Sequence, residues 1–120
     1  MKETIEDFEY KKEAYENMEL YFYTFSPKFK IGSVLSTIVS FKNPHKTIVI
    51  FSRKGSIISI SYRRQDKKFD MNKLARNSIK GLKGAGGGGH IPAAGGHVQI
   101  RDLNMLKRNI ISEIKKMKED

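Results

Sequence analysis

The sequence contains no cysteine and only three prolines among its 120 residues. Without cysteine, neither disulfide bonds nor thiolate metal sites can form. The sequence has no run of 18 apolar residues that could cross a membrane. Its N-terminus is acidic and has no apolar stretch of the kind that marks a signal peptide. With no export signal, we expect a cytoplasmic protein.

Recognisable catalytic patterns are missing as well. The five aspartates, Asp7, Asp66, Asp70, Asp102 and Asp120, are spread along the chain, and no Asp/His cluster has the spacing of a two-metal site. No Ser-His-Asp or Cys-His grouping is visible. No Gly-Lys-Ser/Thr follows the glycines, which excludes a Walker A loop. We therefore expect that this chain alone catalyses no reaction and has no cofactor of its own.

Positive charge exceeds negative charge in this sequence. The net charge is +10, but residues 1–19 hold seven acids and three lysines, a net −4. Residues 20–120 hold 20 lysines and arginines and six acids, a net +14. So basic a body favours a polyanionic partner. The alternative is that the positive charge reflects a lysine-rich proteome, in which most proteins are basic whatever they bind.

Hydrophobic periodicity predicts alternating helices and strands. We expect helices over 4–19, 31–42, 71–82 and 103–117, strands over 20–25, 47–51, 56–64 and 97–100, and a short helix at 92–94. The fold class is therefore α/β, with a mixed central sheet of about four to five strands flanked by helices. We expect residues 1–19 to form an acidic linker or peripheral helix, and residues 20–120 to form the domain itself.

The predicted strand over 56–64 has one apolar and one polar face, because strand side chains alternate. Ile58, Ile60 and Tyr62 point one way, and Ser59, Ser61 and Arg63 point the other. A polar face that ends in arginine suits a phosphate, which guanidinium binds in a bidentate manner. The alternative is an edge strand with a solvated face. Tyr62, on the opposite face from Arg63, is expected in the core.

Three further basic residues follow this strand. We expect Arg64, Lys67 and Lys68 to extend the basic patch and to follow a phosphodiester backbone with little specificity.

Seven glycines fall within residues 84–96, and they are the strongest signal in the sequence. Such a run costs conformational entropy and buries no side chain, so packing does not explain it. It serves where backbone must approach a ligand closely, and N–H groups at a loop followed by a helix start bind anions. The sequence therefore predicts a phosphate-binding loop at Gly84–His90. The alternative is a flexible linker.

The three histidines differ in context. His90 closes the glycine segment, and its ring could donate a hydrogen bond to a phosphate or a base edge. His97 begins a predicted strand and is expected to be a plain surface or packing residue. His45 lies in a loop beside a proline and is given no role.

Two motifs together resemble one family. The segment Gly87-Gly88-Gly89-His90-Ile91-Pro92-Ala93-Ala94-Gly95-Gly96 resembles the GGGHxxAAG signature of the DHHA1 domain, the C-terminal half of DHH phosphoesterases. Ser61-Tyr62-Arg63 resembles the Ser-x-Arg strand of that family, and the likeness extends over about residues 20–118. The family includes RecJ-type exonucleases, nano-RNases, pAp phosphatases and cyclic dinucleotide phosphodiesterases.

The resemblance implies a division of labour. An N-terminal DHH domain holds two manganese ions, and the DHHA1 domain grips the substrate across a cleft. Arg63, Ser61 and His90 would contact phosphates or the terminal nucleotide, and Gly87, Gly88 and Gly89 would form a backbone cradle. The acidic segment 1–19 would match the linker between the two halves.

The sequence departs from the whole-enzyme pattern because it lacks Asp-His-His and the manganese ligands. The partners that the resemblance implies are single-stranded DNA or RNA or a short oligonucleotide, and a DHH catalytic domain in the same or another chain, with no membrane. The alternatives are a non-catalytic nucleic-acid-binding or scaffold module, for tRNA or a replication complex, and a binder of a small nucleotide. The C-terminal domain of alanyl-tRNA synthetase carries a related glycine run, usually followed by arginine-proline, so His90 favours the phosphoesterase branch.

Overall fold

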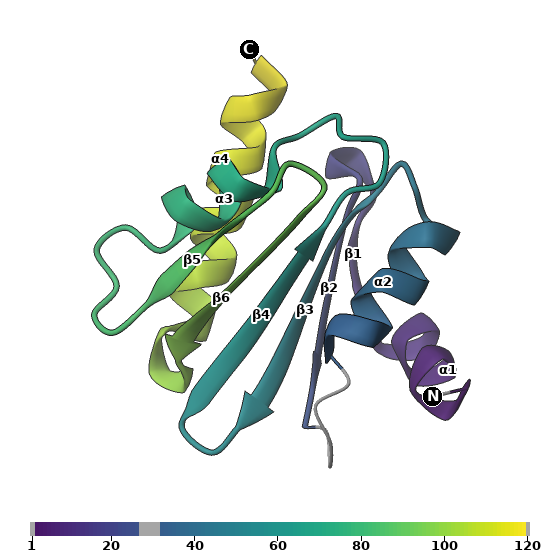
Figure 1. Cartoon of the computed structure of the whole chain (residues 1–120), viewed down its shortest axis with the longest axis horizontal. Coiled ribbons are helices and arrows are strands. Elements are labelled where there is room, and N and C mark those ends of the chain that lie inside the picture. Colours follow the sequence, from purple (N-terminus) through teal and green to yellow (C-terminus); the bar gives the residue numbers. More distant parts are fainter. Residues whose placement is uncertain (1, 27–31, 120) are drawn as a thin grey trace.

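A six-stranded mixed sheet with the strand order β1-β2-β3-β4-β6-β5 forms the centre of the molecule (Figure 1). The computed structural model describes residues 2–26 and 32–119. Its elements are α1 (Lys2–Lys11), β1 (Glu13–Tyr15), η1 (Glu16–Met18), β2 (Leu20–Phe25), α2 (Gly32–Lys42), β3 (Thr47–Lys54), β4 (Ile57–Arg63), α3 (Met71–Ser78), β5 (Gly86–Gly89), β6 (Ala93–Gln99), η2 (Ile100–Asp102) and α4 (Leu103–Glu119). Among the strands that the structure describes, only β2 and β3 pair in parallel. The predicted α/β class is confirmed, and the sheet gains two short strands at its edges.

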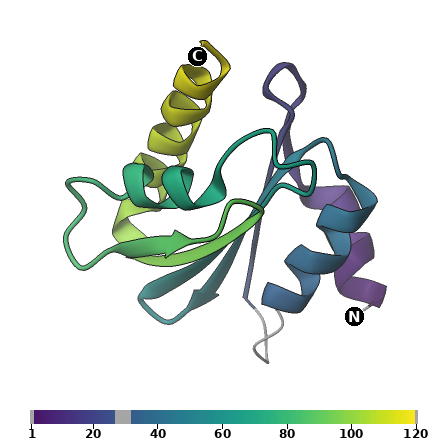
Figure 2. The same cartoon turned by 45° about the horizontal axis from the view of Figure 1, so that its top comes forward.

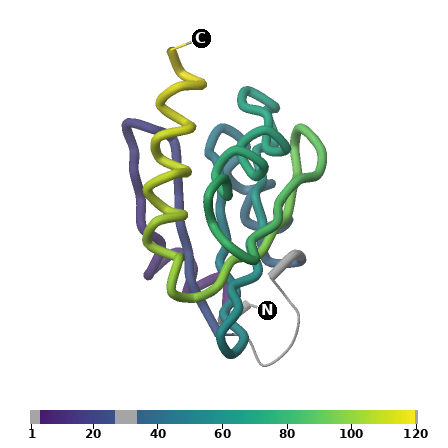
Figure 3. The backbone as a smooth tube through the Cα atoms, turned by 90° about the vertical axis from the view of Figure 1, so that its left-hand side faces the viewer, coloured from purple at the N-terminus to yellow at the C-terminus, as the bar shows by residue number. Residues whose placement is uncertain are grey.

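Helices cover the two faces of the sheet unequally. On one face, α3 and α4 bury the larger core, which includes Phe51, Ile60 and Ile110. On the other face, α1 and α2 cover only β2, β3 and part of β4, around Phe8 and Leu35. Figure 3 shows α4 along one side of the sheet, beside the N-terminal strands. Over β4 and β6, part of the second face is therefore covered by no helix of the described residues.

The central strands follow the sequence pattern. The first five residues of β3 are buried, as their apolar, β-branched character predicts. Along β4 the burial alternates, with Ile58, Ile60 and Tyr62 buried against α3 and α4 and their neighbours more exposed. Both predictions are confirmed, including the core position of Tyr62.

The helix that follows β4 begins where its cap was predicted. Asp70 has extended backbone dihedrals, and its side chain accepts a hydrogen bond from the Lys73 N–H at 3.1 Å. The helix ends at Ser78, earlier than the predicted boundary at residue 82, because Ile79 to Gly81 form a turn. Of the predicted helix over 31–42, Ile31 lies outside the described residues.

The predicted single helix over residues 1–19 is wrong beyond Lys11. Glu13–Tyr15 pair with β2 as an antiparallel strand, and hydrogen-bonding to the sheet edge outweighs the helical spacing of Tyr15 and Met18. The segment is also bound to α4, because Lys107 Nζ lies 2.9 Å from Glu13 Oε2.

In the part of the chain that the structure describes, no helix is both long enough and apolar enough to cross a membrane.

Candidate functional site

The face of β4, β6 and β5 that α2 covers only in part carries the polar residues singled out in the sequence. Figure 1 looks onto these strands, with α2 to one side and α4 behind. Directly paired residues of antiparallel strands share a face, so the strand register sorts the surface into rows. The rows are Arg63, Ala93 and His90; Ser61, Gly95 and Gly88; and Ser59, His97 and Gly86. We call this surface the open face.

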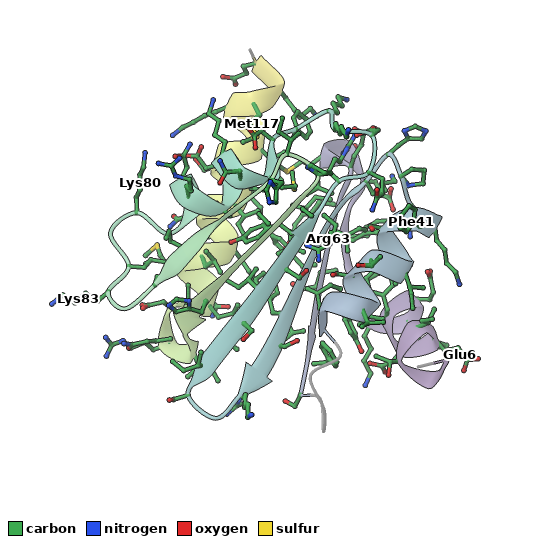
Figure 4. All side chains as sticks on the ribbon, in the orientation of Figure 1. Glu6, Phe41, Arg63, Lys80, Lys83 and Met117 are labelled. Carbon is green, nitrogen blue, oxygen red and sulfur yellow. The ribbon has the colours of Figure 1, made fainter. Side chains whose placement is uncertain are left out.

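Arg63 lies over the middle of the sheet (Figure 4). Its guanidinium is half-buried and donates from Nη1 to the carbonyl oxygens of Tyr62 at 3.1 Å and Ala94 at 3.3 Å. Burial lowers the pKa of the Arg63 guanidinium from its ordinary value, yet arginine stays protonated in proteins. These contacts hold a permanent positive charge close to the backbone of the open face.

Ser61 ties the open face to α2. Its Oγ lies 2.7 Å from Ser36 Oγ, and either hydroxyl can be the donor. A hydroxyl can donate one hydrogen bond and accept two. Ser61 therefore positions α2 beside the open face and keeps a polar group in the row next to Arg63.

The predicted glycine loop is wrong in form, because Gly86–Gly89 are the edge strand β5. Packing also explains part of the glycine content, against the sequence-based argument. A Cβ on Gly87 would lie 2.7 Å from the Ala75 carbonyl oxygen of α3, and a Cβ on Gly96 would lie 2.5 Å from the Gly86 carbonyl oxygen. Only glycine lets α3 and β6 approach β5 this closely.

No helix follows the glycines, so the predicted short helix at 92–94 is also wrong. His90 and Ala93 exchange backbone hydrogen bonds of 2.8 and 3.2 Å and close a tight turn between β5 and β6. The Met71 N–H donates to the Ile91 carbonyl, and the Arg64 N–H donates to the Pro92 carbonyl. No helix begins at residues 92–94, so the predicted anion site at a helix start does not form there. Backbone hydrogen bonds hold a tight turn in its place.

The turn brings His90 to the end of the row that contains Arg63. Arg63 pairs with Ala93, and Ala93 is hydrogen-bonded to His90, so two strand spacings separate the outer residues. With strands about 4.8 Å apart, the Arg63 and His90 Cα atoms lie about 10 Å from each other. His90 is exposed. The structure thus places both predicted ligand-binding side chains at one end of the open face.

His97 is a residue of the open face for which the sequence predicted no binding role. It is exposed and pairs with Ser59 on one side and Gly86 on the other. A Cβ on Gly86 would lie 2.7 Å from His97 Cε1, so the imidazole rests over this glycine. Strand alternation would have revealed His97 if the strand had been predicted from Ala93.

Arg64 does not belong to the basic patch, contrary to the prediction. Its side chain is 0% exposed and lies over the Phe69 ring. Nε donates to Asp66 at 2.7 Å, Nη2 to Glu19 at 3.1 Å, and Nη1 to Thr47 Oγ1 at 3.3 Å. The guanidinium lowers the pKa of the Glu19 carboxyl and holds that of Asp66 well below its usual range. Arg64 is a buried ion-pair centre because carboxylates from two loops meet it.

Lys67 and Lys68 are exposed, in the loop after β4. Lys68 Nζ lies 3.1 Å from Glu19 Oε1, so its charge is partly neutralised. Among the described residues, no group of three His, Asp or Glu side chains is arranged to hold a metal ion.

Comparison with known proteins agrees with this fold. The family model of the DHHA1 domain matches residues 22–116. No curated protein matches the sequence at a significant level. Among solved structures, the C-Ala domain of Aquifex aeolicus alanyl-tRNA synthetase is 23% identical with a TM-score of 0.66, and the match covers 87% of this chain and 96% of that domain.

Two larger proteins contain the same fold. RecJ of Thermus thermophilus in complex with Mn²⁺ is 9% identical with a TM-score of 0.73, over 96% of this chain and 16% of RecJ. A pGpG-specific phosphodiesterase of Vibrio cholerae is 14% identical with a TM-score of 0.65, over 92% of this chain and 37% of that protein. This chain thus spans about a sixth and just over a third of these two proteins. Because the family model covers most of the sequence, the chain belongs to the DHHA1 domain family.

Proposed function

We propose that this chain is the substrate-binding domain of a DHH-type phosphodiesterase and holds the end of a single-stranded DNA or RNA, or a short oligonucleotide, on its open face. The row of Arg63, Ala93 and His90 carries the proposal. Two groups that bind phosphate oxygens lie about 10 Å apart with only a methyl group between them. A terminal phosphate would contact Arg63, and His90 would contact the next phosphate or a base edge.

The glycine strand supplies the floor of this site. Gly88 and Gly95 share the middle row with Ser61, so no side chain rises between Ser61 and the edge of the sheet. Along an antiparallel ladder, hydrogen-bonded pairs alternate with pairs that are not hydrogen-bonded. His90 and Ala93 form a hydrogen-bonded pair, so the N–H groups of Gly87 and Gly89 point away from β6. The Gly89 N–H donates to Asn72 Oδ1 at 2.9 Å. The proposed role of Gly87, Gly88 and Gly89 is therefore close backbone approach to the ligand.

Catalysis is proposed to reside in a DHH domain, in the same protein or in a partner. The two manganese ions of such a domain do not fit the residues described here, which offer no cluster of three ligands. We assign no catalytic residue to this chain. The cytoplasm remains the proposed location.

Binding of a 5′-phosphorylated tetranucleotide, measured by fluorescence anisotropy at two salt concentrations, tests the proposal. Loss of a charge-assisted hydrogen bond costs about 1.5–3 kcal/mol, so Arg63→Ala should weaken binding about 10- to 100-fold. His90→Ala should weaken it several-fold. Arg53→Ala and His45→Ala are matched controls, since both residues are exposed and lie outside the three rows. Folded Arg63→Ala and His90→Ala variants that bind like the wild type would refute the proposal.

A non-catalytic nucleic-acid-binding module is the second candidate. The net charge of +14 on residues 20–120 supports it, because a basic surface attracts a phosphodiester backbone whether or not a strand end is present. A module of that kind would prefer long strands, ignore the strand end and lose affinity steeply with salt.

A further inference from the structure

The outward face of α3 and the turn after it form a ridge of positive charge. Lys73, Arg76 and Lys80 follow one another at spacings of three and four residues, which places them on one side of the helix. All three are exposed, and Figure 4 shows Lys80 projecting from this side of the molecule. We call these three residues the α3 ridge. Together with Asp70, Asn72 and Asn77 they line a hollow of about 520 Å³.

Few carboxylates lie near the α3 ridge: Asp70 lines its hollow, and Glu113 and Glu119 of α4 line a neighbouring hollow with Lys73 and Lys80. Residues 71–83 contain no acid. Asp70 is engaged as the helix cap, and Glu113 of α4 is bound by Asn77 at 3.3 Å and Lys116 at 3.4 Å. Of the ten ion pairs found among the described residues, none includes a ridge residue. Elsewhere, by contrast, Lys11, Lys46, Lys68 and Lys107 each have a carboxylate partner.

The α3 ridge adjoins the glycine strand. A Cβ on Gly88 would lie 3.7 Å from Arg76 Cγ, and Asn72 accepts a hydrogen bond from the Gly89 N–H. Figure 2 shows α3 lying along β5, at the edge of the sheet. A chain that leaves the open face across β5 therefore meets Arg76 first.

We propose that the α3 ridge is a second binding surface, which holds the phosphodiester backbone of a single strand two or more nucleotides away from the end bound on the open face. This inference rests on the proposed function and adds a path for the strand. Lys73 to Lys80 covers about two helical turns, roughly 10 Å, and successive phosphates of a stacked strand advance about 3.4 Å along its axis. The length of the ridge thus matches that of about three successive phosphates.

The chemistry of the ridge indicates backbone binding without base recognition. No aromatic side chain occurs in residues 70–83, so nothing there can stack on a base. Lysine and arginine without stacking partners bind phosphates and carry no sequence information. The ridge should therefore contribute affinity that grows with strand length and is indifferent to sequence.

The test compares 5′-phosphorylated strands of three and fifteen nucleotides by fluorescence anisotropy across a salt series. The ridge variant is Lys73→Gln/Arg76→Gln/Lys80→Gln, and the control is Arg53→Gln/Lys54→Gln/Lys115→Gln, which removes the same charge from exposed sites elsewhere. We expect the ridge variant to lose about tenfold in affinity for the fifteen-mer and to reduce the salt slope by about 2. Its affinity for the trinucleotide should equal that of the control variant, which is expected to keep the length preference.

Equal affinity of the two variants for the fifteen-mer would overturn the inference, as would a wild type that binds the fifteen-mer no more tightly than the trinucleotide. Ridge-dependent binding to phosphatidylserine vesicles without ridge-dependent binding to the fifteen-mer would overturn it in favour of a lipid surface. A failure of the proposed function would give a different experimental result from a failure of this inference. In that case Arg63→Ala and His90→Ala leave trinucleotide binding unchanged while the ridge variant still loses fifteen-mer affinity.

Discussion

Two adjacent glycines of β6 should respond in opposite ways to the same substitution. A Cβ on Gly96 would lie 2.5 Å from the Gly86 carbonyl oxygen and 3.2 Å from the Gly87 Cα. Both atoms are backbone of a paired strand and cannot rotate away. A Cβ on Gly95 would meet only the Ile60 carbonyl oxygen at 3.5 Å, an ordinary contact, and neither glycine has positive φ. Alanine therefore fits at Gly95 and not at Gly96.

The magnitudes follow from these contacts. Overpacking costs about 1–3 kcal/mol, while replacing glycine by alanine at a compatible position stabilises by about 0.4–1 kcal/mol through the unfolded chain. Gly96→Ala should thus lower the free energy of unfolding by about 2 kcal/mol. Gly95→Ala should leave it unchanged or raise it by about 0.5 kcal/mol.

Urea denaturation followed by circular dichroism measures the difference. With m-values of about 1–3 kcal/mol/M for small proteins, the two midpoints should be separated by about 1 M. Gly95→Ala also adds a methyl group to the middle row of the open face, so this stable variant should bind the tetranucleotide more weakly. A Gly96→Ala protein as stable as Gly95→Ala would refute the argument that backbone contact excludes a side chain at Gly96.

Two other predictions concern charged side chains. Replacing Arg64 by methionine should cost about 2 kcal/mol in chemical denaturation, less than for a fully buried pair because Glu19 and Asp66 are 36% and 22% exposed. Because the folded-state pKa of both carboxyls is lowered, wild-type stability should be retained above about pH 5 and fall as the pH decreases further. Arg64→Met should flatten this dependence between about pH 5 and pH 2.5, and an unchanged slope would contradict the assignment. Asp70→Ala removes the acceptor of the Lys73 N–H and should cost about 1 kcal/mol of unfolding free energy, whereas Asp70→Ser should restore most of it.

Much of the fold could be predicted from side-chain patterns, because its central strands bury them. The apolar run of β3 and the alternation of Ile58, Ile60 and Tyr62 in β4 carry enough signal to define both strands and their faces. The Ser-x-Arg and glycine-histidine motifs likewise indicated the residues that the register brings together on the open face.

The remaining features depend on contacts between distant residues. Gly86–Gly89 have no side chains and so no periodicity, and their strand exists because β6 pairs with it and α3 lies against it. Arg63 and Arg64 look alike in the sequence, but burial of Arg64 requires Glu19, 45 residues earlier. Similarly, Glu13–Tyr15 leave the helical pattern only because β2 offers a free edge.

The composition of β5 also bears on self-association. Every open sheet has two edges, whose unpaired backbone groups can recruit a second chain into aggregates. Here one edge strand, β1, is three residues long. The other consists of four glycines, which are poor strand formers and offer no side chains for a neighbouring strand to pack on. Asn72 also occupies the Gly89 N–H. The residues proposed to admit a ligand to the backbone thus also protect the sheet against edge-to-edge polymerisation.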